Sequence, residues 1–431
     1  MAMTLARTII RAGRLIDGTG AAPRSDVAVI LDGSKIASIE PWRDDLRLGA
    51  TVHEFPVETV LPGLVDAHCH LSLLGVGLPY EQEIPNPNEF MAVTAVHNAQ
   101  VMLRSGVTTL RDNGARDGIM FAVREAMNRG LMTGPRMLIS GRPVTPTGGH
   151  FHWCNGTADG VEEIRRVVRM LVQEGADHVK IMASGGGTAG TNPGLPSYAV
   201  DELRAAVDAA HYYGRLTTAH CRAATSIANA IEAGLDCIEH AEFNAPGDLI
   251  EHVADGPNHR PGWDDEIAKR LAGSGMFASL TLPGSGHAAY RALADRRDRE
   301  GTAALTLAER AAVAAGEREM ESRHERVRNF LALGMLPRLV ISSDAGPFDI
   351  EFGKLWQGLE VGVNGGMTTM QAIQAATRVA AEACGILDRV GTLEVGKEAD
   401  VLVVEANPLD DVANLRDVVA VFRAGVRVVG D

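Results

Sequence analysis

The sequence predicts an α/β protein in which a (β/α)8 TIM barrel is joined to a small β-sandwich domain formed by both chain termini. In the middle of the chain, short apolar runs typical of strands alternate with helical patterns about eight times. This repeat predicts a parallel sheet, and eight repeats close such a sheet into a barrel. At the two ends of the chain, strand-like runs instead follow one another without helices, as in antiparallel sheets.

The runs that predict the barrel strands have clear boundaries. They are "TVLPGLVDAHCH", "VTTLRD", "RMLISG", "HVKIMA", "LTTAHC", "CIEHA", "FASLTL" and "LVISSD". Helical segments between them end at glycines such as Gly175 and Gly234, the residue type favoured just after a helix. We expect the barrel to span residues 60–387 and the β-sandwich domain to comprise residues 1–59 and 388–431.

A further segment, near residues 283–338, interrupts the strand–helix repeat. It is rich in Ala, Arg and Glu, a composition that favours helices. We expect a helical insertion that serves as an extended helix pair or an oligomer contact, with a lid as the alternative. We also expect the protein to be a homo-oligomer.

The composition argues against several classes of function. The 431 residues carry a formal net charge of −14, whereas binding to nucleic acid requires a concentrated Lys/Arg surface. No apolar run reaches the length of about 18 residues that a membrane span needs, and "MAMTLARTIIRAG" lacks the apolar core of a signal peptide. The five cysteines are scattered, as in a reducing compartment. We expect a cytoplasmic protein that acts on a small-molecule substrate and binds neither nucleic acid nor a membrane.

Side chains that can bind a metal ion end several of the predicted strands. In "LPGLVDAHCHL", His68 and His70 are two residues apart, so both project from the same face of a strand. Four later strands carry the other candidates, which are Lys180, His220, His240 and Asp344. Each has an ordinary structural explanation when taken alone, such as a hydrogen-bonded histidine or a capping aspartate. Because barrel strands all end at the same face, their joint occurrence predicts a metal centre.

These residue types also suggest the chemistry of the centre. Imidazole nitrogens and carboxylate oxygens are ligands that zinc and similar divalent ions prefer. If Lys180 is buried with a neutral amine, it can take up carbon dioxide and become N6-carboxylysine, which offers one oxygen to each of two ions. A hydroxide bridging the ions would be a strong nucleophile, and Asp344 could move its proton to the leaving group. The expected cofactors are two divalent metal ions, with Zn²⁺ as the first candidate, and N6-carboxylysine at Lys180.

The chain resembles the amidohydrolase superfamily, in the branch of imidazolonepropionase-like proteins and metal-dependent Xaa-Pro or Xaa-Arg dipeptidases. The motifs that carry the resemblance span nearly the whole chain and include "PGLVDAHCH", "GADHVKIMASGG", "GLDCIEHAEF", "ISSDAG" and "GTLEVGKEADVLVVEANPL". The resemblance implies a β-sandwich around a (β/α)8 barrel that holds two metal ions. It also implies that His68, His70 and Asp344 bind the buried ion, that His220 and His240 bind the exposed ion, and that carboxylated Lys180 bridges them.

Three further residues are candidates for binding the substrate. His150 matches the position where relatives place a histidine against the substrate carbonyl or carboxylate; the alternative is a loop histidine bonded to backbone. Many relatives read H-x-H-G after the fifth strand, whereas this chain has Arg222 in place of the second histidine. Arg222 could meet a substrate carboxylate or form a salt bridge in the wall. Tyr198 could reach the pocket or pack at the start of a helix.

The expected activity is hydrolysis of an amide-type C–N bond, in a dipeptide or an N-acyl amino acid, with Asp344 and His150 as catalytic residues. Hydrolysis of a urea, carbamate or anilide is the alternative that Arg222 favours. Two further alternatives are less favoured. A deaminase with one metal ion would not need Lys180, and a scaffold without catalytic activity would be expected to lack some of the ligands, whereas here none is missing. Asp66 is a candidate for orienting the two histidines that follow it.

Overall fold

The computed structural model describes residues 7–246 and 262–430; residues 1–6 and 431, which we assigned to the β-sandwich domain, lie outside this part of the chain, as do residues 247–261 of the expected barrel. The barrel strands begin with β5 and end with β12. They are β5 (Leu64–Cys69), β6 (Val107–Asp112), β7 (Arg136–Ile139), β8 (His178–Met182), β9 (Leu216–Ala223), β10 (Cys237–Asn244), β11 (Phe277–Thr281) and β12 (Leu339–Ser342).

These strands form a closed parallel barrel. Strands β5 to β7 pair in one parallel sheet and β8 to β12 in another. On one side the backbone N–H of Asp344 donates to the carbonyl of His68 (2.9 Å), and on the other the N–H of Val144 donates to the carbonyl of Lys180 (2.8 Å). These bonds join the two sheets into a ring, which confirms the predicted fold class.

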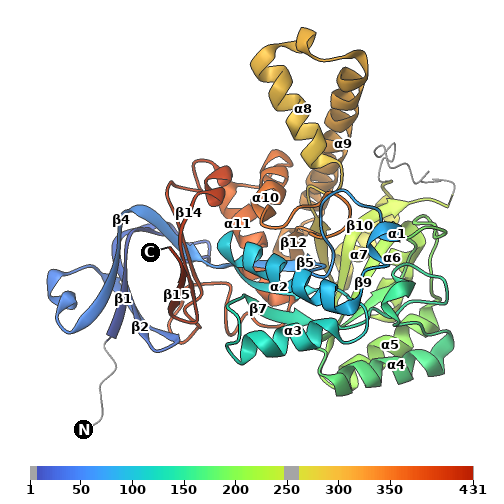
Figure 1. Cartoon of the computed structure of the whole chain (residues 1–431), viewed down its shortest axis with the longest axis horizontal. Helices are drawn as coiled ribbons and strands as arrows, with labels where there is room; N and C mark the ends of the chain where they lie inside the picture. The colour runs from blue at the N-terminus through green and yellow to red at the C-terminus, as the bar shows by residue number, and fades with distance from the viewer. Residues whose placement is uncertain (1–6, 247–261, 431) are drawn as a thin grey trace.

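Helices cover the outside of the barrel (Figure 1). They are α2 (Asn88–Arg104), α3 (Ile119–Asn128), α4 (Gly160–Glu174), α5 (Val200–Tyr212), α6 (Ala224–Ala233), α7 (Asp265–Ser274), α10 (Leu355–Asn364), α11 (Thr369–Ala375) and α12 (Arg378–Ala383). The short helix α1 (Tyr80–Glu83) lies in the segment between β5 and α2. Gly175 and Gly234 end α4 and α6 with φ of 101° and 82°, a left-handed conformation in which a Cβ atom would be strained. Each of these glycines turns the chain toward the next strand.

The two ends of the chain meet in one seven-stranded sheet. Its strands are β1 (Arg7–Leu15), β2 (Arg24–Asp32), β3 (Lys35–Pro41), β4 (Ala50–Pro62), β13 (Val401–Val404), β14 (Val418–Arg423) and β15 (Val426–Val429). The antiparallel pair β4–β13 joins the N-terminal strands to the C-terminal strands. Side chains from both groups, including Ile10, Phe55, Val401 and Phe422, share one buried core. The sheet therefore packs on itself, as expected for a β-sandwich built from both termini.

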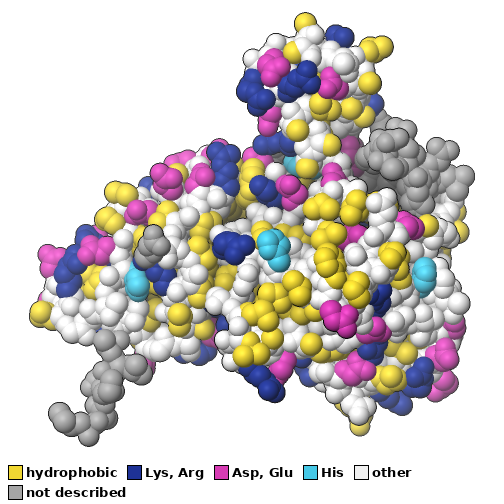
Figure 2. Space-filling model, viewed as in Figure 1, with side chains coloured by type: hydrophobic (Ala, Val, Ile, Leu, Met, Phe, Trp, Pro, Cys, Tyr) yellow, Lys and Arg dark blue, Asp and Glu magenta, His cyan; other side chains and the backbone are white. Residues whose placement is uncertain are grey.

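Two helices, α8 (His287–Glu300) and α9 (Leu307–Ala332), lie between β11 and β12 and project from the barrel (Figure 1). The side chain of Thr306 caps α9, and Arg296 and Arg297 of α8 form ion pairs with Glu309 and Glu317 of α9. Figure 2 shows Lys, Arg, Asp and Glu side chains interspersed on this pair. Within the described residues, none of the helices is both long enough and apolar enough to span a bilayer.

Candidate metal centre

The six predicted ligands converge at the C-terminal end of the barrel, and each is at most 6% exposed. They come from β5 and the residue after it, from β8, β9 and β10, and from the loop after β12. They are His68, His70, Lys180, His220, His240 and Asp344. A chain that unites these side chains must bury several ionisable groups, which is costly unless a partner compensates for the lost hydration.

His68, His70 and Asp344 form a compact triad of potential ligands. Nε2 of His68 lies 3.2 Å from Nε2 of His70, and Oδ1 of Asp344 lies 3.3 and 3.6 Å from these two nitrogens. Ligand atoms about 2.1 Å from a tetrahedral zinc ion lie about 3.4 Å apart. The three atoms are therefore spaced as ligands of one ion.

The hydrogen bonds on the far side of the two rings fix their tautomers. Nδ1 of His68 donates to a carboxylate oxygen of Glu239 (2.9 Å), and Nδ1 of His70 donates to the carbonyl of Gly114 (3.1 Å). A neutral imidazole carries one proton, so both Nε2 atoms present lone pairs. Burial, together with Lys180, lowers the pKa of both rings and keeps them neutral. Two nitrogen lone pairs and a carboxylate oxygen then face one point. Three acceptors this close together lack a donor between them, and a cation bound at that point would stabilise them.

His220 and His240 form the second group of potential ligands. Nε2 of His220 donates to the carbonyl of Gly185 (3.1 Å), which leaves its Nδ1 as an acceptor. Nε2 of His240 lies only 2.8 Å from that Nδ1, and Nδ1 of His240 lies 2.8 Å from the Thr281 hydroxyl. The Thr281 hydroxyl can donate or accept, so these two histidines can satisfy each other without a metal ion.

Lys180 is fully buried, and its Nζ has no hydrogen-bond partner among the residues that the structure describes. Burial lowers the pKa of this amine from 10.5 to about 8, although Glu239 and Asp344 oppose the change. An orphaned buried amine of this kind is costly unless it is chemically altered or paired. The triad therefore fits one divalent ion as it stands, and a carboxylated Lys180 would supply the further ligand that His220 and His240 need for a second ion.

Two of the ligands sit in strained backbone. His240 and Asp344 have φ of 66° and 57°, in the left-handed region that residues other than glycine rarely adopt. In a regular strand, Glu239 and His240 would face opposite sides. The left-handed turn at His240 breaks this alternation, so that both side chains contact groups of the centre. Strain of this kind is typical of functional sites.

The sequence analysis missed Glu239, which lies directly beneath the centre and is fully buried. One carboxylate oxygen accepts from Nδ1 of His68, and the other accepts from Arg111 (2.7 Å) and from the Thr218 hydroxyl (2.5 Å). His68 and Arg111 hold the pKa of Glu239 well below its usual range, although burial acts in the other direction. The signal that could have revealed it is the charged residue inside the apolar run "CIEHA".

Asp66, a candidate for orienting the two histidines, bonds to backbone groups and to Ser343 instead of to their rings. Its carboxylate accepts from the backbone N–H groups of His68 (3.2 Å) and Ser343 (3.1 Å) and from the Ser343 hydroxyl (2.5 Å). Burial raises the pKa of Asp66 to about 6. Asp66 thus ties the end of β5 to the residue before Asp344, and it orients the histidines only through the position of the strand.

His150 lies beside the second pair of histidines and is buried. Its ring centroid is 4.4 Å from that of His220, and the backbone N–H of Thr188 donates to its Nδ1 (3.3 Å). The Thr188 hydroxyl lies 2.8 Å from the same Nδ1 and can also donate to it, so a neutral His150 carries its proton on Nε2. A Cβ atom at Gly186 would lie 2.7 Å from Nε2 of His150, so glycine is needed for this approach.

Arg222 and Tyr198 are both engaged with protein groups. Nη1 of Arg222 donates to the two carboxylate oxygens of Glu242 (2.7 and 2.8 Å), whereas its Nε and Nη2 make no hydrogen bond within the described part of the chain. The Tyr198 hydroxyl donates to the carbonyl of Ala158 (2.7 Å) inside the barrel core. Substrate contact remains a prediction for both residues, and these contacts support it only for Arg222, which keeps unused donors.

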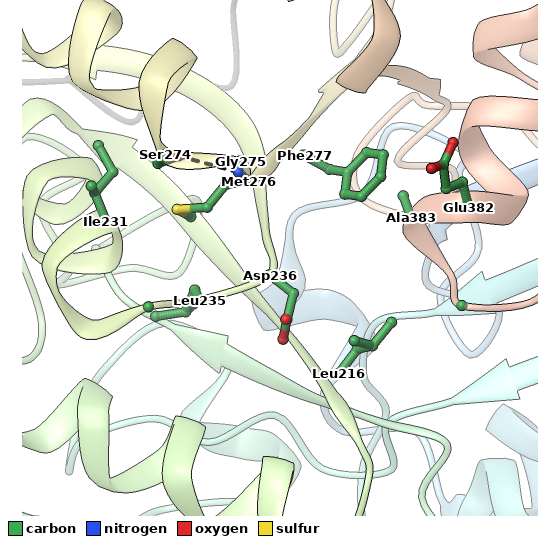
Figure 3. A pocket seen from close by; sticks show the side chains of 12 residues that line it. Leu216, Ile231, Leu235, Asp236, Ser274, Gly275, Met276, Phe277, Glu382 and Ala383 are labelled. Carbon is green, nitrogen blue, oxygen red and sulfur yellow. Dashed lines mark hydrogen bonds between the residues drawn. The ribbon is translucent and has the colours of Figure 1, made fainter.

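A cavity of about 450 Å³ lies at the opposite end of the barrel (Figure 3). It is lined by residues at the N-terminal ends of strands, such as Leu216 and Phe277, and by Asp236 and Glu382. The Asp236 carboxylate already accepts from His211 and Thr217. This cavity contains none of the predicted ligands, and in barrels of this type chemistry takes place at the other face.

Comparisons with known proteins agree with this fold and identify the family of the chain. The sequence model of the amidohydrolase family matches residues 59–428, and the chain therefore belongs to that family. An ochratoxinase from Aspergillus niger is 27% identical over 450 residues, which cover 94% of this chain and 82% of the relative. The chain is accordingly a hydrolytic enzyme.

Two solved structures extend the likeness over the whole chain. A Xaa-Pro dipeptidase with bound methionine in its active site has a TM-score of 0.79 at 28% identity, covering 98% of this chain and 100% of that chain. A prolidase in complex with N-methylphosphonate-L-proline has a TM-score of 0.78 at 26% identity, covering 99% and 100%. Both likenesses place this chain near dipeptidases within the family.

Proposed function

We propose that the protein is a binuclear metal-dependent hydrolase that cleaves an amide-type C–N bond in a dipeptide or an N-acyl amino acid. The observation that carries this proposal is the convergence of three acceptor atoms, from His68, His70 and Asp344, together with a buried Lys180 amine that has no hydrogen-bond partner within residues 7–246 and 262–430. The similarity to a Xaa-Pro dipeptidase and a prolidase supports the choice of bond.

Each potential ligand has a place in this proposal. His68, His70 and Asp344 would hold one ion, His220 and His240 the other, and carboxylated Lys180 would contribute one oxygen to each. When bound, the two ions would make a water molecule acidic enough to attack at neutral pH and would polarise the scissile carbonyl.

Asp344 is the group that can move a proton during the reaction. Its Oδ1 faces His68 and His70, and its Oδ2 lies 3.8 Å from Nδ1 of His240. Burial raises the pKa of this carboxyl, which makes Oδ2 a better proton acceptor. Asp344 would take a proton from the attacking water and pass it to the leaving nitrogen, while Nε2–H of His150 donates to the substrate.

The surroundings of His150 suggest which substrates fit. Aromatic rings of Tyr80, Phe151 and Phe348 pack together beside it, with ring centroids of Tyr80 and Phe348 4.9 Å apart. Apolar walls with a few polar groups are typical of small-molecule sites. The unused donors of Arg222 provide the polar group, so we propose an apolar substrate that carries a carboxylate.

Hydrolysis of a urea, carbamate or anilide is the alternative. The observation that favours it is Arg222 in place of the second histidine of the H-x-H-G pattern. Glu242 partly neutralises the charge of Arg222 through their ion pair. An arginine paired in this way is also compatible with a neutral substrate, such as a urea. A cytoplasmic location, zinc as the ion and a homo-oligomeric state stay predictions.

Metal analysis followed by a substrate panel tests the proposal. We expect about two ions per chain, loss of hydrolysis after treatment with a chelator and its return with Zn²⁺. The panel contains dipeptides, N-acyl amino acids and aryl ureas, and we expect turnover of the first two classes. Activity that survives complete metal removal would refute the proposal, and turnover of the ureas alone would establish the alternative.

A further inference from the structure

A charged cluster lies beyond the metal centre, on the wall between the barrel and the projecting helices. It consists of Arg222 of β9, Glu242 of β10 and Arg326 of α9. Nη1 of Arg222 lies 2.7 Å from Oε1 of Glu242, and Nη1 of Arg326 lies 3.7 Å from the same oxygen. The two guanidinium groups therefore sit next to each other and share a single carboxylate.

Arg326 is poorly satisfied in this arrangement. It is 5% exposed, and its Nε and Nη1 have no hydrogen-bond partner in the part of the chain that the structure describes. Arg323, one turn earlier on α9, is buried to a similar degree but donates to Glu319 (3.1 Å) and to the carbonyl of Ser285 (3.4 Å). Arginine cannot lose its charge in a protein, so a buried guanidinium with unused donors calls for an acceptor.

The cluster adjoins the reacting centre. Arg222 and Glu242 follow His220 and His240 by two residues in their strands. Burial has the largest influence on the pKa of both His240 and Asp344, and the charge of Arg222 lowers the pKa of both groups. A substrate held at the ions could therefore extend a second group toward Arg222 and Arg326.

We propose that Arg326 and Arg222 together form a subsite for a carboxylate of the substrate, with Arg326 as a specificity residue supplied by the helical insertion. This inference rests on the proposed function and adds the chemical class of the group that the site selects. A carboxylate matches the planar fork of a guanidinium and forms charge-assisted hydrogen bonds with it. Glu242 would hold the two like charges together while the subsite is empty.

Binding of matched acids and amides to the metal-loaded full chain tests this proposal. The probes are N-acetyl-L-phenylalanine, N-acetyl-L-leucine and N-acetyl-L-proline, each compared with its carboxamide by titration calorimetry. We expect the protein to bind an acid about 10- to 100-fold more tightly than its amide, as for hydrogen bonds to charged groups. In Arg326→Gln we expect this preference to fall about tenfold, with the affinity for the amide unchanged.

Two further variants separate recognition from a structural role. Arg323→Gln, on the same helix and similarly buried, should keep the acid preference. Glu242→Gln breaks the same ion pair as Arg326→Gln but removes the competing carboxylate, so it should increase the preference for the acid. A lower acid preference in Arg326→Gln together with a higher one in Glu242→Gln would support the subsite. Equal losses of acid and amide binding in both variants would show that the cluster only supports the wall.

The outcomes also separate this inference from the proposed function. Hydrolysis of the N-acetyl amino acids without any preference for acid over amide would overturn the subsite and leave the hydrolase standing. Preferential binding of the acids that Arg326→Gln abolishes, without hydrolysis of any probe or of the dipeptides in the substrate panel, would uphold the subsite and contradict the proposed reaction. Failure of all three acids to bind would overturn the subsite.

Discussion

The two halves of the candidate metal centre are built differently. In the half formed by His68, His70 and Asp344, the facing atoms lie 3.2 to 3.6 Å apart, as ligands of one ion do. In the half formed by His220 and His240, the facing nitrogens lie 2.8 Å apart, as partners in a hydrogen bond do. The first half is arranged for a cation in advance, and the second half has to open to receive one.

The cause of this difference lies behind the rings. The partners of His68 and His70 are a carboxylate and a carbonyl, which can only accept, so both Nε2 atoms are forced to carry lone pairs. The partner of His240 is the Thr281 hydroxyl, which can take either role. Whether the centre holds one or two ions therefore depends on whether Lys180, once carboxylated, contributes an oxygen ligand between the halves.

Removal of the Lys180 amine should have the largest effect. We expect Lys180→Ala to lower kcat/KM about a thousandfold or more, because several kcal/mol of stabilisation from the second ion is lost. Elemental analysis should show about one ion per chain in place of two, since the half with His220 and His240 lacks a third ligand. Lys180→Glu, which restores a carboxylate, should retain more of the second ion. Full activity with two ions in Lys180→Ala would refute the carboxylated lysine.

Loss of the charge on Glu239 should weaken only the half that contains His68. We expect Glu239→Gln to reduce the affinity for the tighter-bound ion about 10- to 100-fold, as is typical when the partner of a metal-binding histidine is changed. Competition with a chromophoric chelator measures the two ions separately. The variant should also be less stable, because Arg111 loses its buried ionic partner. Equal weakening of both ions would indicate that Glu239 supports the barrel as a whole.

The sequence was sufficient to predict the fold and to single out six side chains that the structure brings together, because both depend on local patterns. The strand-like runs end in polar residues at regular intervals, and the spacing of His68 and His70 follows directly from the period of a strand. Glu239 was missed because period-two alternation places it opposite His240, and only a left-handed backbone at His240 lets both side chains contact the centre; the charged residue in an apolar run was the one local signal. Arg326 lies in a helix far along the chain, and only the packing of that helix brings it to Glu242.

The formation of carboxylated Lys180 should depend on pH. Only the neutral amine reacts with carbon dioxide, and burial brings the pKa of Lys180 down to about 8. The neutral fraction therefore rises as pH increases through 8 and then levels off. We expect the rate of activation of the metal-free protein by Zn²⁺, at constant dissolved carbon dioxide, to increase about tenfold between pH 7 and pH 9. In Lys180→Glu, uptake of metal should not depend on carbon dioxide.

The same pKa has a consequence for the stability of the metal-free protein, with a definite sign. Lys180 is protonated up to about pH 8 in the folded state but up to about 10.5 when unfolded. Between these values the unfolded state binds more protons, so the free energy of unfolding should rise with pH in this window. Denaturant titrations of metal-free protein and of Lys180→Ala should differ in this slope, and identical slopes would contradict the lowered pKa of the buried amine.

The smallest effect is expected from Thr281, which orients the half that has to open. Thr281→Val removes the hydroxyl beside Nδ1 of His240 and keeps the volume of the side chain. We expect the affinity for the weaker ion to fall about fivefold, as for one neutral hydrogen bond of about 1 kcal/mol. The affinity for the ion held by His68, His70 and Asp344 should not change. This result would be the reverse of that expected for Glu239→Gln, which should weaken the ion in that half. A loss of the tighter ion instead would mean that the two halves are one coupled site, and the contrast between them would disappear.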